Sequence, residues 1–263
     1  MVKTFVLGLG AQKAGTSWFY DWLMRKPGAV AGERKEYNVW NRVSGLEDMP
    51  PPKPGAIKLM CQDPDFYFDY FADLLDQPDC MLTSDFSPGY AGLDADTLRQ
   101  ISHGFQRRGI RCVAVFLMRD PVERLWSMAR MNHARQKTPK VDFSDSPSSE
   151  DVLLRIYQTP RAAMRTRYDN TLQAMEAAFP ASDRFVGIYE ELFVPGGTEN
   201  VSELLGIPAN SSFKVRVNQG PAAPRPSSPV LARVAEEYRC VYAACRSRYP
   251  RLKSIWPGYS LLA

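Results

Sequence analysis

Hydrophobic residues gather in short runs along the chain, and segments with helical spacing separate these runs. Residues 4–9 and 112–118 are almost continuously apolar, which is typical of parallel strands that are covered on both faces. Residues 80–83 and 185–189 are shorter strand candidates. Because helical patterns lie between the runs, their order predicts βαβ units. We therefore expect an α/β fold of three layers, in which helices flank a central parallel sheet.

The helical patterns differ in how they use aromatic residues. A helix that begins at Thr16 carries Trp18 and Trp22 on one face. Aromatic residues crowd positions 66–71, where we expect a helix packed in the core, with part of an acceptor pocket as the alternative. Residues 230–245 place their apolar side chains on one face, which predicts a C-terminal helix.

Two polar segments interrupt this order. Residues 137–151 contain two prolines and predict a mobile loop, and residues 219–229 form another long irregular segment. Neither segment separates regions of different composition. We therefore expect a single domain over residues 1–263.

Composition narrows the function classes. The 263 residues are 44% hydrophobic and 24% charged, as in an ordinary globular protein. The net charge of +4 suits an anionic ligand but does not argue for nucleic acid. The five cysteines contain no C-x-x-C pair, which favours reduced thiols over a disulfide framework. With only two histidines, no His/Cys cluster has metal-ligand spacing, and we expect no metal.

The N-terminus predicts no targeting segment. The first apolar run is short and leads directly into a glycine-bearing loop, so cleavage as a signal peptide would destroy that loop. No stretch approaches the ~18 apolar residues of a membrane span. We therefore expect a cytoplasmic protein without a transmembrane segment.

The loop after the first strand has most of the features of a P-loop. Gly10 and Gly15 have the P-loop spacing, but Thr16 stands where that motif has lysine, and the loop's lysine is Lys13. A strand–loop–helix junction directs backbone N–H groups and the positive end of a helix dipole at one point. The loop therefore predicts phosphate binding, with a turn that serves only the fold as the alternative.

A second anion site follows the run 112–118. Arg119 is expected at the carboxyl end of a parallel strand, where open α/β sheets bind ligands. Asp120 can cap the next helix, with Glu123 closing a capping box, and Ser127 lies about two turns further on. A guanidinium and a hydroxyl can converge on one phosphate. The alternative is that Arg119 pairs with Asp120 or Glu123 and that Ser127 only packs.

These two motifs together resemble those of sulfotransferases. The segment Lys13, Ala14, Gly15, Thr16, Ser17 and Trp18 resembles their 5′-phosphosulfate loop, and Arg-Asp-Pro-x-x-Arg-x-x-Ser over 119–127 resembles their 3′-phosphate motif. The resemblance implies a P-loop-like fold, 3′-phosphoadenosine 5′-phosphosulfate (PAPS) as donor and 3′-phosphoadenosine 5′-phosphate (PAP) as product. It implies that Arg119 and Ser127 hold the 3′-phosphate, with Arg124 in support.

The segment 32–38 resembles the Lys-Glu-Pro-His segment of heparan sulfate sulfotransferases. The resemblance implies that Glu36 is the base that accepts the acceptor's proton and that Lys35 lies near the sulfuryl group. A solvated charge run is the alternative interpretation. Glu33 is the reserve base, and a histidine base, His103 or His133, is less favoured by position.

The resemblance implies ligand contacts for three further sets of residues. Ser84 to Tyr90 is similar to a Glu-Lys-Ser/Thr-Pro-x-Tyr segment, which implies acceptor contacts from Ser87, Tyr90 and Phe86, the last in place of lysine. Tyr168 is expected to reach the nucleotide. Arg225, in the segment 219–229, is expected to close over it.

The expected activity is transfer of a sulfuryl group to a hydroxyl, or with less support an amine, of a carbohydrate, lipid or small-molecule acceptor. Two alternatives remain. A P-loop kinase or NTPase would bind ATP with Mg²⁺, although it would lack the lysine at position 16. A non-catalytic nucleotide-binding protein would keep Lys13 and Arg119 without needing Glu36.

Overall fold

A parallel sheet forms the centre of the computed structural model, which describes residues 2–136, 148–209 and 222–262. Its strands have the order β2-β1-β3-β4. Central strand β1 (Thr4–Gly10) pairs with β2 (Leu82–Phe86) on one side and β3 (Arg111–Met118) on the other. Strand β4 (Arg184–Ile188) pairs with β3 at the edge. The predicted α/β fold with a central parallel sheet is confirmed.

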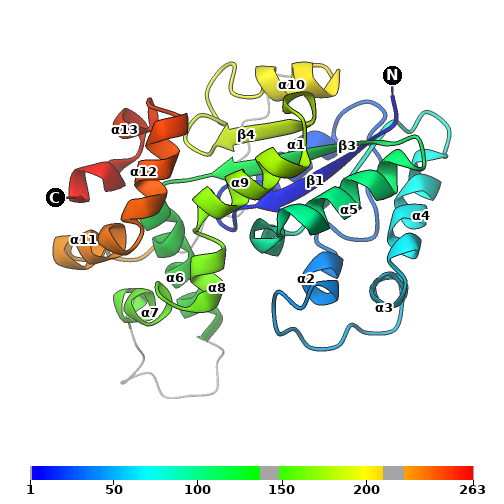
Figure 1. Ribbon diagram of the computed structural model, residues 1–263. Helices are drawn as coiled ribbons and strands as arrows, with labels where there is room; N and C mark the ends of the chain where they lie inside the picture. The colour runs from blue at the N-terminus through cyan, green and yellow to red at the C-terminus, as the bar shows by residue number, and fades with distance from the viewer. Residues whose placement is uncertain (1, 137–147, 210–221, 263) are drawn as a thin grey trace.

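Helices cover both faces of this sheet. Figure 1 shows α5 (Ala95–Gln106) and α9 (Tyr168–Ala178) in front of the strands and α1 (Thr16–Met24) behind them. Helix α6 (Pro121–Gln136) leaves the end of β3. The other described helices are α2 (Val39–Val43), α3 (Ala56–Gln62), α4 (Pro64–Leu75), α7 (Ser149–Ile156), α8 (Pro160–Met164), α10 (Glu199–Leu205), α11 (Ser228–Glu237), α12 (Arg239–Arg248) and α13 (Leu252–Ile255), with 3₁₀ turns η1 (Pro88–Gly92), η2 (Ala181–Asp183) and η3 (Pro257–Leu261).

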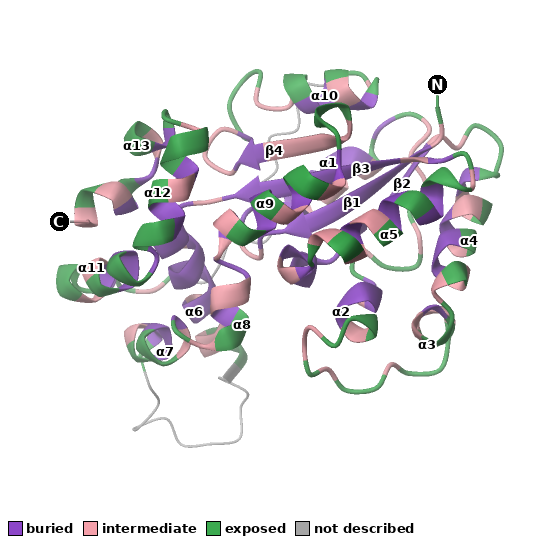
Figure 2. Cartoon of the chain, viewed as in Figure 1, coloured by how far each residue is buried: buried purple, intermediate pink, exposed green. Residues whose placement is uncertain are grey.

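A cluster of buried aromatic rings fills the core where the strands meet α4 and α5. Figure 2 shows the central strands as buried along their length. On β1, the Phe5 ring stacks on Phe105 with centroids 4.0 Å apart and meets Phe71 edge-on at 4.7 Å. Tyr67 and Phe68 of α4 are buried in the same aromatic cluster. Tyr67, Phe68 and Phe71 are therefore helix core, as expected, and the partly buried Phe66 and Tyr70 pack against that core.

Two predicted elements have different bounds. The strand expected at 80–83 runs instead over Leu82–Phe86, because the polar Asp85 is fully satisfied inside the sheet by buried donors. The C-terminal helix expected at 230–245 is two helices, α11 and α12, which are divided at Tyr238. Tyr238 leaves helical geometry there, and its buried hydroxyl donates to the carbonyl of Tyr157.

The two predicted loops are only partly described. Residues 137–147 lie outside the described chain, but the rest of the segment 137–151 is not loop. Ser148 and Asp151 form a reciprocal capping box that starts α7 at Ser149. Of the segment 219–229, residues 219–221 are not described, residues 222–227 are irregular, and the last two residues already belong to α11.

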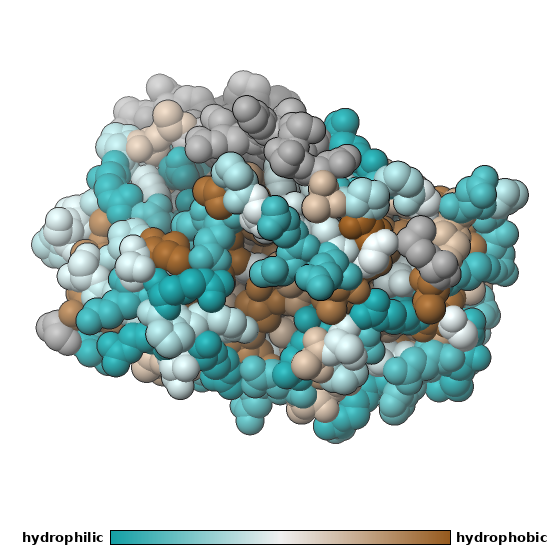
Figure 3. Space-filling view, turned by 90° about the horizontal axis from the view of Figure 1, so that it is seen from above, coloured by the Kyte–Doolittle hydropathy of each residue, from teal (hydrophilic) through white to brown (hydrophobic). Residues whose placement is uncertain are grey.

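The described residues on the face seen in Figure 3 are mostly hydrophilic. On the face seen in Figure 3, hydrophobic residues lie in small separate areas among hydrophilic ones. Large hydrophobic side chains that are clearly exposed include Phe193 and Val194 on the segment after β4. None of the described helices is both long and apolar enough to cross a membrane.

Candidate functional site

A cleft of about 800 Å³ opens at the carboxyl ends of β1 and β3. In a parallel sheet, this edge is where ligands bind. Both predicted anion motifs contribute to its wall. Lys13 comes from the loop after β1, and Thr16 and Ser17 come from the first turn of α1. Arg119 follows directly after β3, and Ser127 lies on α6. Gly15, Trp18, Lys35 and Glu36 also line it.

The loop after β1 has the backbone geometry of an anion cradle. Gly10, Lys13 and Gly15 all adopt positive φ angles, of 110°, 70° and 87°. Gly15 is the N-cap of α1, and no side chain caps that helix. A Cβ on Gly15 would lie 3.1 Å from the Tyr189 ring, which adds a packing reason for glycine. The N–H groups of the first turn are therefore left for another acceptor. Ala14 is buried and does not line the cleft, and its N–H donates to the Ala11 carbonyl at 3.1 Å.

Lys35 joins this loop from elsewhere in the chain. Its Nζ lies 3.0 Å from Ser17 Oγ, 3.3 Å from Thr16 Oγ1 and 3.0 Å from Glu36 Oε1. The Lys35 carbonyl accepts a hydrogen bond from the N–H of Phe86 at the end of β2, 2.8 Å away. The charged segment 33–36 is thus not simply solvated.

Among the described residues that line the cleft, Glu36 is the only one with a carboxylate side chain. Its side chain is 44% exposed and lies beside Lys35. The reserve base, Glu33, is exposed and does not line the cleft, and neither do His103 and His133. The geometry therefore favours Glu36 over these alternatives as a group that could contact a bound acceptor.

Asp85 is a buried carboxylate that organises the segment around Glu36. It accepts hydrogen bonds from the backbone N–H of Tyr37 (3.3 Å) and from the hydroxyls of Tyr67 (3.1 Å), Ser87 (2.6 Å) and Tyr90 (2.7 Å). Burial raises the pKa of Asp85 to about 6, although these donors oppose the shift. The segment that carries Glu36 is therefore anchored to the end of β2.

The three residues expected to contact the acceptor point into the protein instead of lining the cleft, which corrects that expectation. Ser87 and Tyr90 are fully buried and bond Asp85, and Ser87 Oγ also accepts from the N–H of Asn38 at 2.8 Å. Phe86 is buried in the core, with its ring centroid 5.6 Å from that of Phe19. None of the three lines the cleft. The side chain at position 86 is core packing here.

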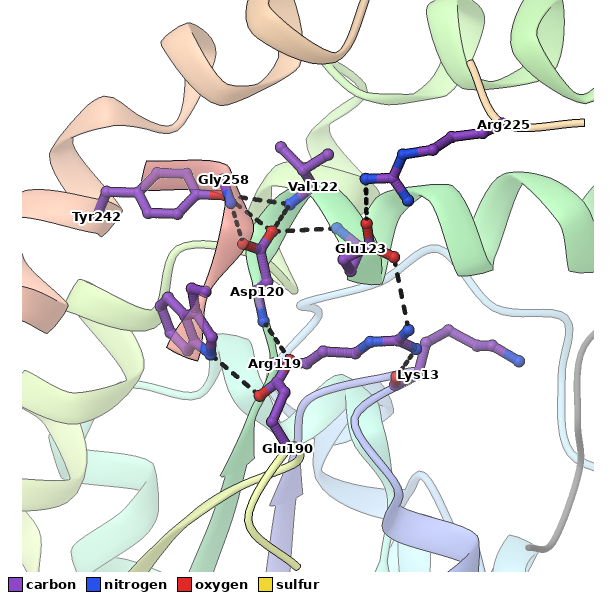
Figure 4. Close-up of polar contacts among 10 residues, drawn as sticks. Lys13, Arg119, Asp120, Val122, Glu123, Glu190, Arg225, Tyr242 and Gly258 are labelled. Atoms are coloured by element: carbon purple, nitrogen blue, oxygen red, sulfur yellow. Dashed lines mark hydrogen bonds and ion pairs between the residues drawn. The ribbon is translucent and has the colours of Figure 1, made fainter. Parts of the chain in front are cut away.

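Arg119 is held in place on several sides, as Figure 4 shows in part. Its Nη1 donates to the Lys13 carbonyl at 3.2 Å, and its guanidinium lies over the Tyr189 ring at 4.5 Å. Glu123 Oε2 is 3.8 Å from Nη2, so the expected alternative pairing exists but is loose. Arg119 Nε is buried without a partner among the described residues. The guanidinium is thus fixed at the cleft with donor capacity left over.

Asp120 caps α6, but the expected capping box is wrong. Asp120 Oδ1 accepts from the N–H groups of Val122 (2.8 Å) and Glu123 (3.2 Å), while its own N–H donates to Glu190 at 3.3 Å (Figure 4). Because Glu190 takes that N–H, Glu123 turns toward Arg119 and Arg225 instead.

Tyr168 and Arg225, which were expected at the nucleotide, have other contacts, and Arg124, which was expected to support Arg119 and Ser127, lies behind the site. Tyr168 is buried, and its hydroxyl donates to the Arg119 carbonyl at 2.9 Å. Arg225 pairs with Glu123 at 2.7 Å. Arg124 is buried and donates to Thr166 Oγ1 at 2.7 Å, and more weakly to the Gln12 carbonyl at 3.4 Å. None of the three lines the cleft, so Tyr168 and Arg124 support the site from behind.

Four arginines that the sequence reasoning missed also line the cleft: Arg130, Arg135, Arg161 and Arg165. Arg130 lies three positions after Ser127, so helical spacing puts both on one face of α6. This spacing could have predicted Arg130 as a cleft residue from the sequence. Arg161 and Arg165 reach the cleft from α8 and the residue after it, through a fold contact that no local pattern announces.

An aromatic corner completes the wall. The ring of Phe193 meets Trp18 at 4.9 Å and Tyr189 at 5.0 Å between centroids, both edge-on. All three residues line the cleft, and Phe193 is partly exposed. Aromatic faces of this kind are suited to stacking on a nucleobase.

The positive charges around the cleft affect the pKa of Lys13. The pKa of Lys13 is lowered from its usual value by burial and then by the charges of Arg119, Arg130 and Arg135. A bound anion would relieve this repulsion. Among the described residues, no group of three or more His, Cys, Asp or Glu side chains could hold a metal ion. The arrangement is therefore suited to polyanions held by protein cations.

Comparison with known proteins bears on the fold. Neither a protein-family model nor a curated protein matches the sequence. A solved sulfotransferase from Alicyclobacillus acidocaldarius is similar, with a TM-score of 0.58 and 15% identity over 94% of this chain and 96% of that chain. The sulfotransferase domain of a Synechococcus olefin synthase has a TM-score of 0.43 and 15% identity over 80% of this chain and 74% of that chain. The sulfotransferase domain from the curacin biosynthetic pathway has a TM-score of 0.46 and 14% identity over 81% of this chain and 76% of that chain. The resemblance seen in the motifs thus extends to the architecture, and this chain has the sulfotransferase fold.

Proposed function

We propose that this protein transfers a sulfuryl group from PAPS to a hydroxyl, or less readily an amine, of a carbohydrate, lipid or small-molecule acceptor. One observation carries the proposal. Two anion sites, the loop Lys13–Ser17 and the pair Arg119 and Ser127, line the same cleft.

The donor is inferred from the separation of these sites on adjacent βα junctions. A nucleotide with phosphate at both ends of its ribose would satisfy both sites, whereas ATP has no 3′-phosphate for Arg119 and Ser127. The loop after β1 and the first turn of α1 would hold the 5′-phosphate through hydroxyl and backbone donors, and Lys35, which contacts Thr16 and Ser17, would lie at the sulfuryl group that PAP lacks. The aromatic corner of Trp18, Tyr189 and Phe193 would stack on the adenine ring of the donor.

The chemistry needs a base and positive charge. An S–O bond forms to the acceptor oxygen, the bridging S–O bond of the donor breaks, and the acceptor's proton passes to Glu36. Lys13 and Lys35 would stabilise negative charge on the leaving phosphate and the sulfuryl oxygens. Glu36 is exposed enough to meet an acceptor and lies beside Lys35. These groups supply the positioning and charge on which such transfers depend.

Two observations weigh against the alternatives. A kinase or NTPase would need a lysine after Gly15, and Thr16 stands there. A non-catalytic binding protein would have no use for a carboxylate anchored inside the cleft by the Asp85 network.

The test is a transfer assay with radiolabelled PAPS against glycans, lipids and small alcohols, with mass spectrometry of the products. We expect a labelled acceptor and PAP in equal amounts. Glu36→Gln should lower the turnover by at least about 100-fold, because general base catalysis contributes that much, and should leave PAP affinity intact. Glu33→Gln, a matched change outside the cleft, should leave both unchanged. Full activity of Glu36→Gln would move the base elsewhere.

A further inference from the structure

Two arginines, Arg161 and Arg165, line the cleft together with the candidate base Glu36. Arg161 belongs to α8, and Arg165 follows directly after that helix. Both line the cleft, yet Arg161 has a largely exposed side chain (68%) and Arg165 a buried one (7%). One guanidinium is therefore free to meet a ligand while the other is fixed behind it.

These two guanidiniums share a single carboxylate. Arg165 Nη2 lies 2.6 Å and 2.9 Å from the two oxygens of Glu47, and Arg161 Nε lies 3.1 Å from one of them. Asn41 Nδ2 donates to the other at 2.8 Å. Glu47 is 7% exposed, so its charge faces the protein rather than the cleft. One positive charge in this group is left uncompensated.

Burial of Arg165 makes the lack of a second negative charge costly. The pKa of Arg165 is lowered, first by burial, and the attraction of Glu47 does not offset burial and the repulsion of Arg161. Arg165 Nε is also buried without a hydrogen-bond partner among the described residues. Uncompensated charge and unpaired buried donors both favour an additional anion nearby.

The position of the pair separates it from the donor sites. Glu36 is close enough for its charge to act on Arg165, whereas the arginines whose charges act on Lys13 are Arg119, just after β3, and two arginines of α6. Glu47 and Asn41 both come from the segment just after Glu36. Arg161 and Arg165 therefore border the acceptor side of the cleft, next to the candidate base.

We propose that Arg161 and Arg165 bind a singly charged anionic group of the acceptor, such as a carboxylate, and so direct its hydroxyl to Glu36. This inference rests on the proposed function and narrows its acceptor class. A single negative charge matches the one charge that Glu47 leaves uncompensated. A neutral acceptor would leave that charge without a partner.

The test titrates 4-hydroxybenzoate and its uncharged methyl ester into the PAP-saturated protein, with binding measured by calorimetry. Saturation with PAP fills the donor sites, so that only an additional anion site is seen. We expect the acid to bind at least about fivefold more tightly than the ester. Arg161→Gln should remove that preference while leaving PAP affinity unchanged. Arg107→Gln is the control, because Arg107 has a similarly exposed side chain (64%) outside the cleft.

Several outcomes would overturn the inference: no binding of the acid, equal binding of acid and ester, or a preference that survives in Arg161→Gln. A loss of PAP affinity in Arg161→Gln as large as that in Arg119→Ala would assign the pair to the donor instead. Failure of the wild-type protein to bind PAP would sink the proposed function. The anion site would then be tested on the PAP-free protein, where a preference for the acid that is lost in Arg161→Gln but kept in Arg119→Ala would support the pair, and any other result would overturn it.

Discussion

The ammonium of Lys35 lies 3.0 Å from the hydroxyl of Ser17, although the two residues are 18 positions apart in sequence. The same ammonium contacts Thr16 Oγ1 and Glu36 Oε1. One lysine therefore joins the phosphate loop, which belongs to the proposed donor site, to the carboxylate proposed as the base. This junction explains why a charge run after α1 belongs to the site.

Replacing Lys35 with methionine tests that junction. The variant keeps the length of the side chain but removes its charge beside the proposed sulfuryl position. We expect turnover to fall about 100-fold, the usual cost of one electrostatic contact in a transition state, while PAP affinity changes by less than about threefold. Lys58→Met, an exposed change on α3, is the control. An equal loss of PAP affinity and turnover would reassign Lys35 to donor binding alone.

Lys13 predicts how donor binding depends on pH. Burial and three arginines lower the pKa of Lys13 below its usual 10.5, and a bound anion favours the charged lysine. Affinity for PAP should therefore be full at neutral pH and fall as alkaline pH passes through that lowered pKa. Calorimetry across this range checks the direction. Lys13→Met should bind more weakly at neutral pH and lose this part of the dependence; an unchanged profile would contradict the assignment.

Asp85 predicts a stability change at acid pH. Its pKa rises from 3.8 in the unfolded chain to about 6 on burial, so the folded state binds the proton more tightly. Its contribution is then fully present below about pH 4 and is lost as pH rises through about 6. At about 1.4 kcal/mol per unit, this amounts to about 3 kcal/mol.

Urea denaturation of the wild type and Asp85→Asn between these pH values isolates that contribution. The wild type should lose stability relative to the variant as pH rises, even if the variant is less stable throughout. Asp96→Asn, with a 91% exposed side chain, should follow the wild-type profile. Parallel profiles for the wild type and Asp85→Asn would mean that the buried carboxylate does not titrate in this range.

The sequence predicted the parts of the site that are local. Lys13, Gly15 and Arg119 follow directly from a strand and precede a helix, so their place at the sheet edge comes with the strand–loop–helix pattern. The central sheet was predictable for the same reason, since continuous apolar runs signal strands buried on both faces.

The sequence could not predict what depends on distant packing. Ser87 and Tyr90 turn inward because Asp85 is buried in β2, and the strand was expected to end before that residue. Arg161 and Arg165 reach the cleft only because α8 packs beside the segment around Glu47. Neither arrangement leaves a periodic signal in one stretch of chain.

The central claim is that the cleft recognises a nucleotide with phosphates at both ends of its ribose. Calorimetry with PAP and ADP tests it directly, because ADP lacks the 3′-phosphate that Arg119 and Ser127 would hold. PAP should bind about 100-fold more tightly, the sum of two charged hydrogen bonds, and Arg119→Ala should remove most of this preference while Arg107→Ala should not. Equal affinities of the wild-type protein for PAP and ADP would mean that the cleft has no site for the 3′-phosphate.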